Sequence, residues 1–257
     1  MRSVDKKKQV RYTVCMITAF LTIDDIATPN TPAIMDFLAS KAIQPVMFCW
    51  GHMVERYRQQ AVYAAKHGAI LQNHSYSHPQ FSTLSFEEAV QEIEKNEQIL
   101  ASLYAEAGVA RPFKLFRFPY GDQGGANSGK LQEYLHAHGF CQLESSAISP
   151  QSYAAAGFSE NQAANADILW TFDFAEYTIR PGKSVTIADS LARAEKAFPA
   201  PQEPVPQNGC APDGSCAQHI ILIHDHVETE QMQAGYFRLL IETLLSHGVR
   251  FVPPRIN

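Results

Sequence analysis

The stretch Val14–Asp25, with the sequence VCMITAFLTIDD, indicates the fold class because a long apolar run ends in two adjacent acidic residues. Runs of this length that are rich in Ile, Phe, Leu and Thr are typical of buried strands. Lysines precede the run, so it loosely resembles a signal peptide, but the run is short and leads straight into Thr22-Ile23-Asp24-Asp25. We therefore interpret Val14–Ile23 as the first strand of a sheet.

Beyond this strand, short apolar runs alternate with helical patterns, and this alternation predicts an α/β fold. Further strands are expected at Pro45–Cys49, Ala69–Gln72, Leu115–Arg117, Ile168–Phe172, Ile220–His224 and Arg250–Val252. Helices are expected at Pro32–Ser40, Met53–Lys66, Phe86–Tyr104, Lys130–His138, Ile187–Phe198 and Ala234–Ser246. The clearest helix start is Ser85-Phe86-Glu87-Glu88, which has the pattern of a capping box. The recurring order of helix, glycine and strand favours a barrel or an open parallel sheet.

The length and composition of the chain limit which classes of protein it can belong to. The chain has 257 residues, of which 46% are apolar and 18% charged, so it can bury a substantial core and is neither disordered nor collagen-like. We expect a single domain over residues 1–257, with surface insertions at about 145–166 and 199–217. The formal charge is −5, which excludes a basic footprint for nucleic acid. No apolar run reaches the length of a membrane-spanning helix.

The cysteines differ in their surroundings. Cys15, Cys49 and Cys141 stand beside apolar residues, where a buried thiol is expected. Cys210 and Cys216 bracket a turn-rich segment after several prolines, so a disulfide between them is favoured over a metal clip that would lack a second ligand pair. Such a disulfide indicates a periplasmic or extracellular location.

Polar residues gather at the ends of the expected strands. Asp24-Asp25 closes the first strand, and the segments 74–78, 117–121, 170–173 and 224–226 follow later ones. In parallel α/β folds, the loops at the carboxyl ends of the strands meet in one site. The sequence therefore predicts a single active site built from these segments.

His74 and His78 are four residues apart, a spacing that places both imidazoles on one face of a helical or tightly turned segment. Two histidines that only cap a loop would be the simpler interpretation. The acidic pair at another strand end favours a zinc site instead, because one carboxylate can complete the ligand set while the other transfers protons. On this interpretation the glycosylation sequon at Asn73 is accidental.

These residues together resemble a known family. The ordered set Thr22-Ile23-Asp24-Asp25, His74-Ser-Tyr-Ser-His78, Arg117-Phe-Pro-Tyr120, Trp170 with Asp173, and Leu222-Ile-His224-Asp225 is similar to the motifs of the polysaccharide deacetylases, the NodB-homology enzymes of carbohydrate esterase family 4. The resemblance runs from about Thr13 to Val252. It implies a distorted (β/α) barrel of the seven-strand type, with the active site at the carboxyl ends of the strands.

The resemblance also implies a role for each matching residue. Asp25, His74 and His78 would hold a divalent metal, usually Zn²⁺, with Co²⁺ as a possible substitute. Asp24 would be the general base and would pair with Arg117, and the backbone N–H of Tyr120 would stabilise the oxyanion. His224 would protonate the departing amine, supported by Asp173 or Glu176, of which we favour Asp173. Trp170, Leu222 and Pro119 would line the substrate pocket.

The sequence departs from the family pattern at two points. The family usually has Gly-Pro after the first motif, where this chain has Ile26-Ala27, and Asp-Trp where this chain has Glu176-Tyr177. From these changes we expect an altered substrate fit rather than a loss of activity. Asp225 and His226 are expected to be structural. Capping or surface roles are expected for His52, His67, His136, His138, His219 and His247.

The resemblance implies a hydrolase that removes N-acetyl groups from N-acetylglucosamine in a β-1,4-linked polysaccharide, with peptidoglycan as the first candidate and chitin oligomers as the second. An O-acetyl esterase acting on xylan would use the same site. The alternative from another class is a catalytically silent carbohydrate-binding protein, made by the altered loop at Ile26. The expected partner is thus an acetylated polysaccharide, and the expected location is the periplasm or the exterior.

Overall fold

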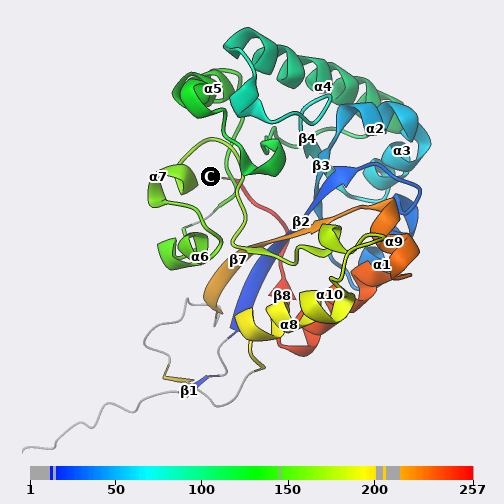
Figure 1. Ribbon diagram of the computed structural model, residues 1–257, viewed down its shortest axis with the longest axis vertical. Coiled ribbons are helices and arrows are strands. Elements are labelled where there is room, and N and C mark those ends of the chain that lie inside the picture. The colour runs from blue at the N-terminus through cyan, green and yellow to red at the C-terminus, as the bar shows by residue number, and fades with distance from the viewer. Residues whose placement is uncertain (1–11, 14–15, 145, 201–204, 207–214, 257) are drawn as a thin grey trace, which may run out of the picture.

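The computed structural model describes residues 12–13, 16–144, 146–200, 205–206 and 215–256. Its main sheet is parallel and follows the order β4 (Ile70–Asn73), β3 (Val46–Cys49), β2 (Met16–Ile26), β7 (Ser215–His224) and β5 (Phe172–Asp173), with β8 (Val249–Phe251) paired to the first part of β2. The strands β2 and β7 cross the middle of the molecule side by side (Figure 1). A separate antiparallel pair joins β1 (Tyr12–Thr13) to β6 (Val205–Pro206).

Two irregular segments join the edges of this sheet. The N–H of Arg117 donates to the Asn73 carbonyl at 3.1 Å, and the N–H of Ile168 donates to the Phe116 carbonyl at 2.8 Å. The N–H of Thr171 then donates to the Ile220 carbonyl of β7 at 2.8 Å. The expected α/β fold is confirmed. These bonds connect β4, through the two irregular segments, to β7 on the other side of the sheet. The expected strand at Leu115–Arg117 is wrong, because regular pairing there is limited to isolated bridges such as Asn73 with Phe116.

Helices surround the sheet (Figure 1). Their bounds are α1 Thr31–Ser40, α2 Gly51–Arg56, α3 Arg58–Lys66, α4 Phe86–Ala107, α5 Ser128–Ala137, α6 Pro150–Ala155, α7 Glu160–Ala163, α8 Ile187–Ala197, α9 Val227–Met232 and α10 Tyr236–Ser246. Short 3-10 turns lie at η1 Phe81–Thr83, η2 Pro119–Gly121, η3 Gly125–Asn127 and η4 Glu176–Thr178. The single helix expected over Met53–Lys66 is wrong, because the backbone leaves the helical region at Tyr57, with φ −119° and ψ 47°.

The alternation of side chains along β2 separates two parts of the core. Ala19, Leu21 and Ile23 belong to the large cluster packed beneath the helices, whereas Phe20 belongs to a second cluster with Val46, Phe48, Leu115 and Ile220. Successive side chains of a strand point to opposite faces, so Thr22 and Asp24 share the face of Phe20. The polar end of this face is where the catalytic residues are expected.

The start of α4 confirms the expected capping box. The hydroxyl of Ser85 accepts from the N–H of Glu88 at 3.2 Å, and the Glu88 carboxylate accepts from the N–H of Ser85 at 2.8 Å. The helix ends at Gly108, whose φ of 70° is the left-handed conformation that glycine adopts without strain. These end contacts fix the position of the longest helix, which contacts α2, α3, α5 and β4.

The expected insertion at 145–166 forms α6 and α7 and packs against the sheet through residues such as Phe158. The other, at 199–217, lies largely outside the described residues, as do Cys15, Cys210 and the side chain of Cys216, so the expected disulfide stays a prediction. Cys49 is buried as expected, whereas Cys141 is partly exposed.

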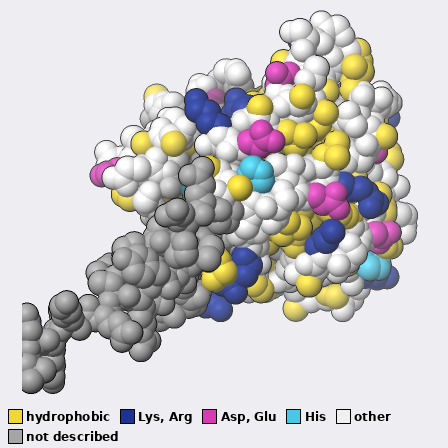
Figure 2. Space-filling view, turned by 90° about the horizontal axis from the view of Figure 1, so that it is seen from below, with side chains coloured by type: hydrophobic (Ala, Val, Ile, Leu, Met, Phe, Trp, Pro, Cys, Tyr) yellow, Lys and Arg dark blue, Asp and Glu magenta, His cyan; other side chains and the backbone are white. Residues whose placement is uncertain are grey.

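Surface charge is mixed on the face seen from below, where basic and acidic side chains are interspersed (Figure 2). Within the described segments, no helix combines the length and apolar character needed to cross a bilayer. Among the described residues visible in Figure 2, the basic side chains form separate groups near acidic ones.

Candidate active site

A pocket of about 390 Å³ lies at the carboxyl ends of the central strands. Its walls come from β2, β7 and β5 and from the loops that follow β3, β4 and the Arg117 segment. The expected residues Asp24, Asp25, His74, His78, Tyr120, Trp170, Asp173, Leu222 and His224 all line it. Thus the residues that the strand-end pattern singled out meet in one place.

Asp24 is fixed by a fully buried arginine. Arg117 Nη1 lies 2.7 Å from Asp24 Oδ1 and 2.9 Å from the hydroxyl of Thr22, and the guanidinium stacks over the Phe48 ring. A buried guanidinium needs a charged partner, because an isolated buried charge is very costly. The expected pairing of Arg117 with Asp24 is present, with Arg117 beneath the pocket rather than on its wall.

Asp25 faces the same pocket as Asp24 although the two are adjacent in a strand. In a regular strand, successive side chains point to opposite faces, so one of the two carboxylates would point away from the pocket. Asp25 instead has a φ of 65°, so the extended conformation ends at this residue. Asp25 Oδ1 lies 3.7 Å from His74 Nε2 and 3.1 Å from His78 Nε2. Local backbone geometry therefore places both carboxylates beside the histidines.

The donor set of Asp25, His74 and His78 fits a divalent metal. Candidate ligand atoms of the three residues lie within 4.8 Å of one another. His74 Nδ1 contacts the Arg117 carbonyl at 2.8 Å, so this nitrogen carries the proton and the Nε2 lone pair faces the pocket. Burial lowers the pKa of His74 to about 4, which favours the neutral form that binds metals.

Asp25 supplies the anionic partner of this set. Its Oδ1 is buried and has no hydrogen-bond partner within the described part of the chain. Burial raises the pKa of Asp25, but the hydrogen bond from His226 and the nearby imidazoles of His78 and His74 outweigh that effect and place it well below the usual value. A buried, ionised oxygen with no donor is the atom that a cation would satisfy.

The loop that carries the two histidines is held by residues from outside the motif. Glu92 of α4 accepts from the N–H groups of Tyr76 and Ser77 at 3.0 and 2.7 Å. Asn73 Oδ1 accepts from the N–H of Ser75 at 2.9 Å. The sequence did not indicate Glu92, because only the packing of α4 brings it to the loop. Asn73 itself is fully buried, in keeping with an accidental sequon.

Glu176, rather than the favoured Asp173, contacts His224. Glu176 Oε1 lies 3.2 Å from His224 Nδ1 and also accepts from the His224 backbone N–H. Asp173 instead accepts from the N–H of Ala175 at 2.8 Å. The expectation of Asp173 as the direct partner is therefore wrong. The turn at Ala175, with φ 55°, brings the Glu176 side chain back to His224.

The buried carboxylate of Glu176 raises the pKa of the His224 imidazole. Burial lowers the pKa of His224, but the hydrogen bond and charge of Glu176 reverse this effect and raise the value to about 10. Burial raises the pKa of Asp173 to about 6. The pair formed by His224 and Glu176 thus favours a protonated imidazole facing the pocket.

Aromatic rings form much of the pocket wall. Tyr120, with φ 60° and 66% of its surface exposed, lies edge-on to His78 with 4.7 Å between ring centroids. Trp170 is braced by Phe158 of the 145–166 insertion at 4.9 Å, so this insertion supports the wall from behind. Pro119 is buried and does not line the pocket, contrary to expectation.

Four pocket residues were not identified from the sequence as site residues, namely Trp50, Tyr177, Arg180 and His226. Trp50 directly follows the end of β3, so the expectation that residues at the carboxyl ends of strands form the site could have identified it. His226 was expected to be only structural, yet its Nε2 lies 2.7 Å from Asp25 Oδ2. Asp225 is structural as expected, since it is fully buried and accepts from the hydroxyls of Thr28 and Thr31.

The remaining expectations concern residues away from the pocket wall. Ile26 and Ala27 are fully buried in the core, so the departure from Gly-Pro does not alter the pocket surface directly. The histidines expected in capping or surface roles do not line the pocket: His52, His67, His136, His138, His219 and His247.

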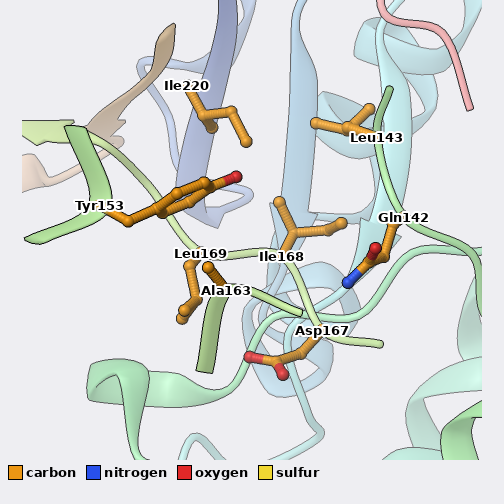
Figure 3. A pocket seen from close by; sticks show the side chains of 8 residues that line it. All are labelled: Gln142, Leu143, Tyr153, Ala163, Asp167, Ile168, Leu169 and Ile220. Atoms are coloured by element: carbon orange, nitrogen blue, oxygen red, sulfur yellow. The ribbon is translucent and has the colours of Figure 1, made fainter. Parts of the chain in front are cut away.

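A second cavity near Asp167 has a volume of only about 10 Å³ (Figure 3). It lies between the sheet and the 145–166 insertion and is lined by apolar side chains such as Ile168, Ile220 and Tyr153. The Asp167 carboxylate is buried and accepts from Gln123 and Gln132, and burial raises its pKa to about 6. A cavity of this size has room for one water molecule at most.

Comparison with known proteins agrees with this geometry. A peptidoglycan-N-acetylglucosamine deacetylase of Bacillus cereus is 34% identical over 103 residues, which cover 40% of this chain and 36% of that protein. The match thus spans about a third of the length of that relative.

Solved structures share the fold. The peptidoglycan deacetylase PdaC of Bacillus subtilis has a TM-score of 0.56 at 21% identity, covering 92% of this chain and 87% of that one. The chitin deacetylase of Colletotrichum lindemuthianum has a TM-score of 0.56 at 19% identity, covering 91% and 84%. The family model described as polysaccharide deacetylase matches residues 6–141, just over half of the chain. The chain belongs to the polysaccharide deacetylase family.

Proposed function

We propose that this protein is a zinc-dependent N-deacetylase acting on N-acetylglucosamine residues of a β-1,4-linked polysaccharide, with peptidoglycan as the first substrate and chitin oligomers as the second. The observation that carries the proposal is the placement of Asp24 and His224. They are register partners on the adjacent strands β2 and β7, and they line the same pocket as the Asp25, His74 and His78 set. A carboxylate and a protonated imidazole beside three metal ligands suit amide hydrolysis.

In this proposal, Asp25 Oδ1, His74 Nε2 and His78 Nε2 hold the metal. When bound, the ion supplies a Lewis acid that polarises the acetyl carbonyl and lowers the pKa of water. The two imidazoles are prepared for this role because their Nε2 atoms face the Asp25 carboxylate at 3.7 and 3.1 Å. Zinc is proposed because nitrogen and carboxylate donors in a set of three leave an open position for a reactant.

Asp24 and His224 divide the proton transfers. Asp24 accepts a proton from water as the oxygen attacks the acetamide carbonyl, while Arg117 fixes its carboxylate at 2.7 Å. The C–N bond then breaks, and His224 donates a proton to the leaving sugar amine. The products are acetate and a free amine on the sugar. Glu176 keeps His224 protonated for this second transfer.

The pocket wall orients the reacting group. The backbone N–H of Tyr120 is proposed to donate to the carbonyl oxygen as negative charge develops, an effect typically worth about 3 kcal/mol per donor. Trp170 and Leu222 line the pocket where an acetyl methyl can be enclosed, and the exposed ring of Tyr120 offers an apolar face to a pyranose ring. We further propose that the protein acts on the cell wall, in the periplasm or outside the cell.

The test is acetate release from peptidoglycan and from chitopentaose, with zinc supplied or removed by a chelator. We expect release by the wild type with zinc, and a loss of about a hundredfold or more in Asp24→Asn, since general base catalysis typically contributes that much. The matched control is Asp36→Asn on the exposed outer side of α1. Acetate from acetylated xylan alone would favour the O-acetyl esterase. Glycan binding without any release would favour a silent binding protein.

A further inference from the structure

Asp25 uses its two oxygens differently. Oδ1 faces His74 and His78, whereas Oδ2 lies 2.7 Å from Nε2 of His226. The other ring nitrogen of His226, Nδ1, lies 3.2 Å from Nη2 of Arg180. Arg180, His226 and Asp25 therefore form a continuous hydrogen-bonded chain that ends on the proposed metal ligand.

The chemistry of the guanidinium assigns the proton on His226. A guanidinium has only donors, so His226 Nδ1 must accept from Arg180. In a neutral imidazole the other nitrogen then carries the hydrogen, and Nε2–H donates to Asp25 Oδ2. This bond holds the carboxylate rotation in which the lone pairs of Oδ1 face the two histidines.

His226 is itself held at its backbone as well as at its ring. Its backbone N–H donates to the hydroxyl of the buried Tyr236 at 3.2 Å, and its carbonyl accepts from the Asn30 side chain at 3.2 Å. Arg180 is held in turn, because its Nε donates to the Tyr177 carbonyl at 2.7 Å. Contacts from α10 and from the loop before α1 thus fix the His226 backbone, and Arg180 and Asp25 hold its ring.

We propose that His226, oriented by Arg180, is a positioning residue that fixes the Asp25 carboxylate for metal binding. The inference rests on the proposed metal site, and it adds two residues that contribute through Asp25 without binding the ion. Residues that orient metal ligands in this way typically contribute about 10- to 100-fold in metal affinity. The exposed Arg180 would contribute less than His226, because it acts through one further contact.

The test measures the dissociation constant for Zn²⁺ by competition with a chromophoric chelator, with no substrate present. We expect His226→Ala to weaken binding by about 10- to 100-fold. His226→Gln should stay within about threefold of the wild type, because its amide nitrogen reaches the place of Nε2 and can donate to Asp25. His226→Asn should behave like the alanine variant, because its shorter amide does not reach that place. Arg180→Met should lose a few-fold.

The matched control is His136→Ala, an exposed histidine of α5 that does not line the pocket. Thermal unfolding in excess chelator separates positioning from folding, and we expect the metal-free midpoints of wild type, His226→Gln and Arg180→Met to agree. Unchanged zinc affinity in both His226→Ala and His226→Asn would overturn the positioning role alone. Loss in His226→Gln equal to that in His226→Ala would also overturn it, because the imidazole itself would then be required. A wild type that binds no zinc would overturn the metal site and the inference together.

Discussion

At the scale of single residues, the site depends on backbone conformations that sequence alone does not specify. Asp25, His78, Tyr120 and Ala175 all have positive φ values, between 55° and 65°, and each lies in or beside the pocket. Non-glycine residues adopt this region infrequently, and it is often associated with functional sites. At Asp25 and Ala175 the conformation decides which carboxylate reaches which histidine.

The assignment of Glu176 as the partner of His224 predicts a change in pH dependence. Because the carboxylate raises the pKa of His224 to about 10, the imidazole stays protonated, and the proton donor is lost only as pH rises through that value. In Glu176→Gln the pKa falls, so the alkaline limb of kcat/KM should move to lower pH by on the order of one unit or more. Asp173→Asn should move the limb less, because Asp173 acts on His224 only by charge. An equal shift in both variants would contradict the assignment.

At the scale of elements, α4 supports the loop that carries two of the three candidate metal ligands. It begins at the Ser85 capping box and carries Glu92, whose carboxylate holds the loop between His74 and His78. Asn96, one turn further along, donates to the Cys49 carbonyl and to Asn73 Oδ1 at 2.7 and 2.9 Å. A helix that is distant in sequence from the acidic pair therefore holds the loop that carries the two histidines.

This arrangement predicts that a substitution within α4 and one at its N-cap have different effects. Glu92→Ala removes the acceptor for two loop N–H groups, so zinc affinity should fall by about tenfold. Ser85→Ala removes only the cap, so the free energy of unfolding should fall by about 1 kcal/mol while zinc affinity is retained. Denaturant unfolding and zinc titration of both variants provide the check, with Gln98→Ala on the exposed face as the control. Unchanged zinc affinity in Glu92→Ala would exclude the supporting role.

At the scale of the whole molecule, metal binding and folding stability should be linked. The ligands come from β2 and the loop after β4, so an ion bridges two segments that the unfolded chain does not hold together. Zinc at one hundred times its dissociation constant should stabilise the native state by about 2.7 kcal/mol. For a domain of this size that corresponds to roughly 5–10 °C in Tm.

Removal of zinc by a chelator is the control for the predicted zinc-dependent rise in Tm. A chelator should return Tm to the zinc-free value without unfolding the protein, because the hydrophobic core does not include the ligand set. His74→Ala should show no zinc-dependent shift and should keep a folded circular dichroism spectrum. A variant that is unfolded without zinc would instead make the site a structural one.

The features of this protein that follow from local sequence patterns could be predicted from the sequence. The strand ends located Asp24, Asp25 and the histidines, because the carboxyl ends of parallel strands must converge. Sequence reasoning favoured Asp173 over Glu176 because Asp173 stands three residues after Trp170, as in the family pattern, and an alanine at position 175 gives no sign of the positive φ found there. It missed Glu92 and placed His226 only as structural, because their contacts join residues 15 and 201 positions apart in the chain. It also missed the break at Tyr57, which divides one apolar pattern between two helices.

The pairing of β2 with β7 determines the order in which the parts of the pocket can assemble while the chain is being synthesised. Asp24 leaves the ribosome about two hundred residues before its register partner His224. Until then β2 can pair only with β3 through its last residues, because its other partners β7 and β8 are not yet made. Long-range parallel pairings of this kind form slowly, because a long loop must close first. A nascent chain of this protein therefore gains the complete set of pocket residues only after β7 has been synthesised.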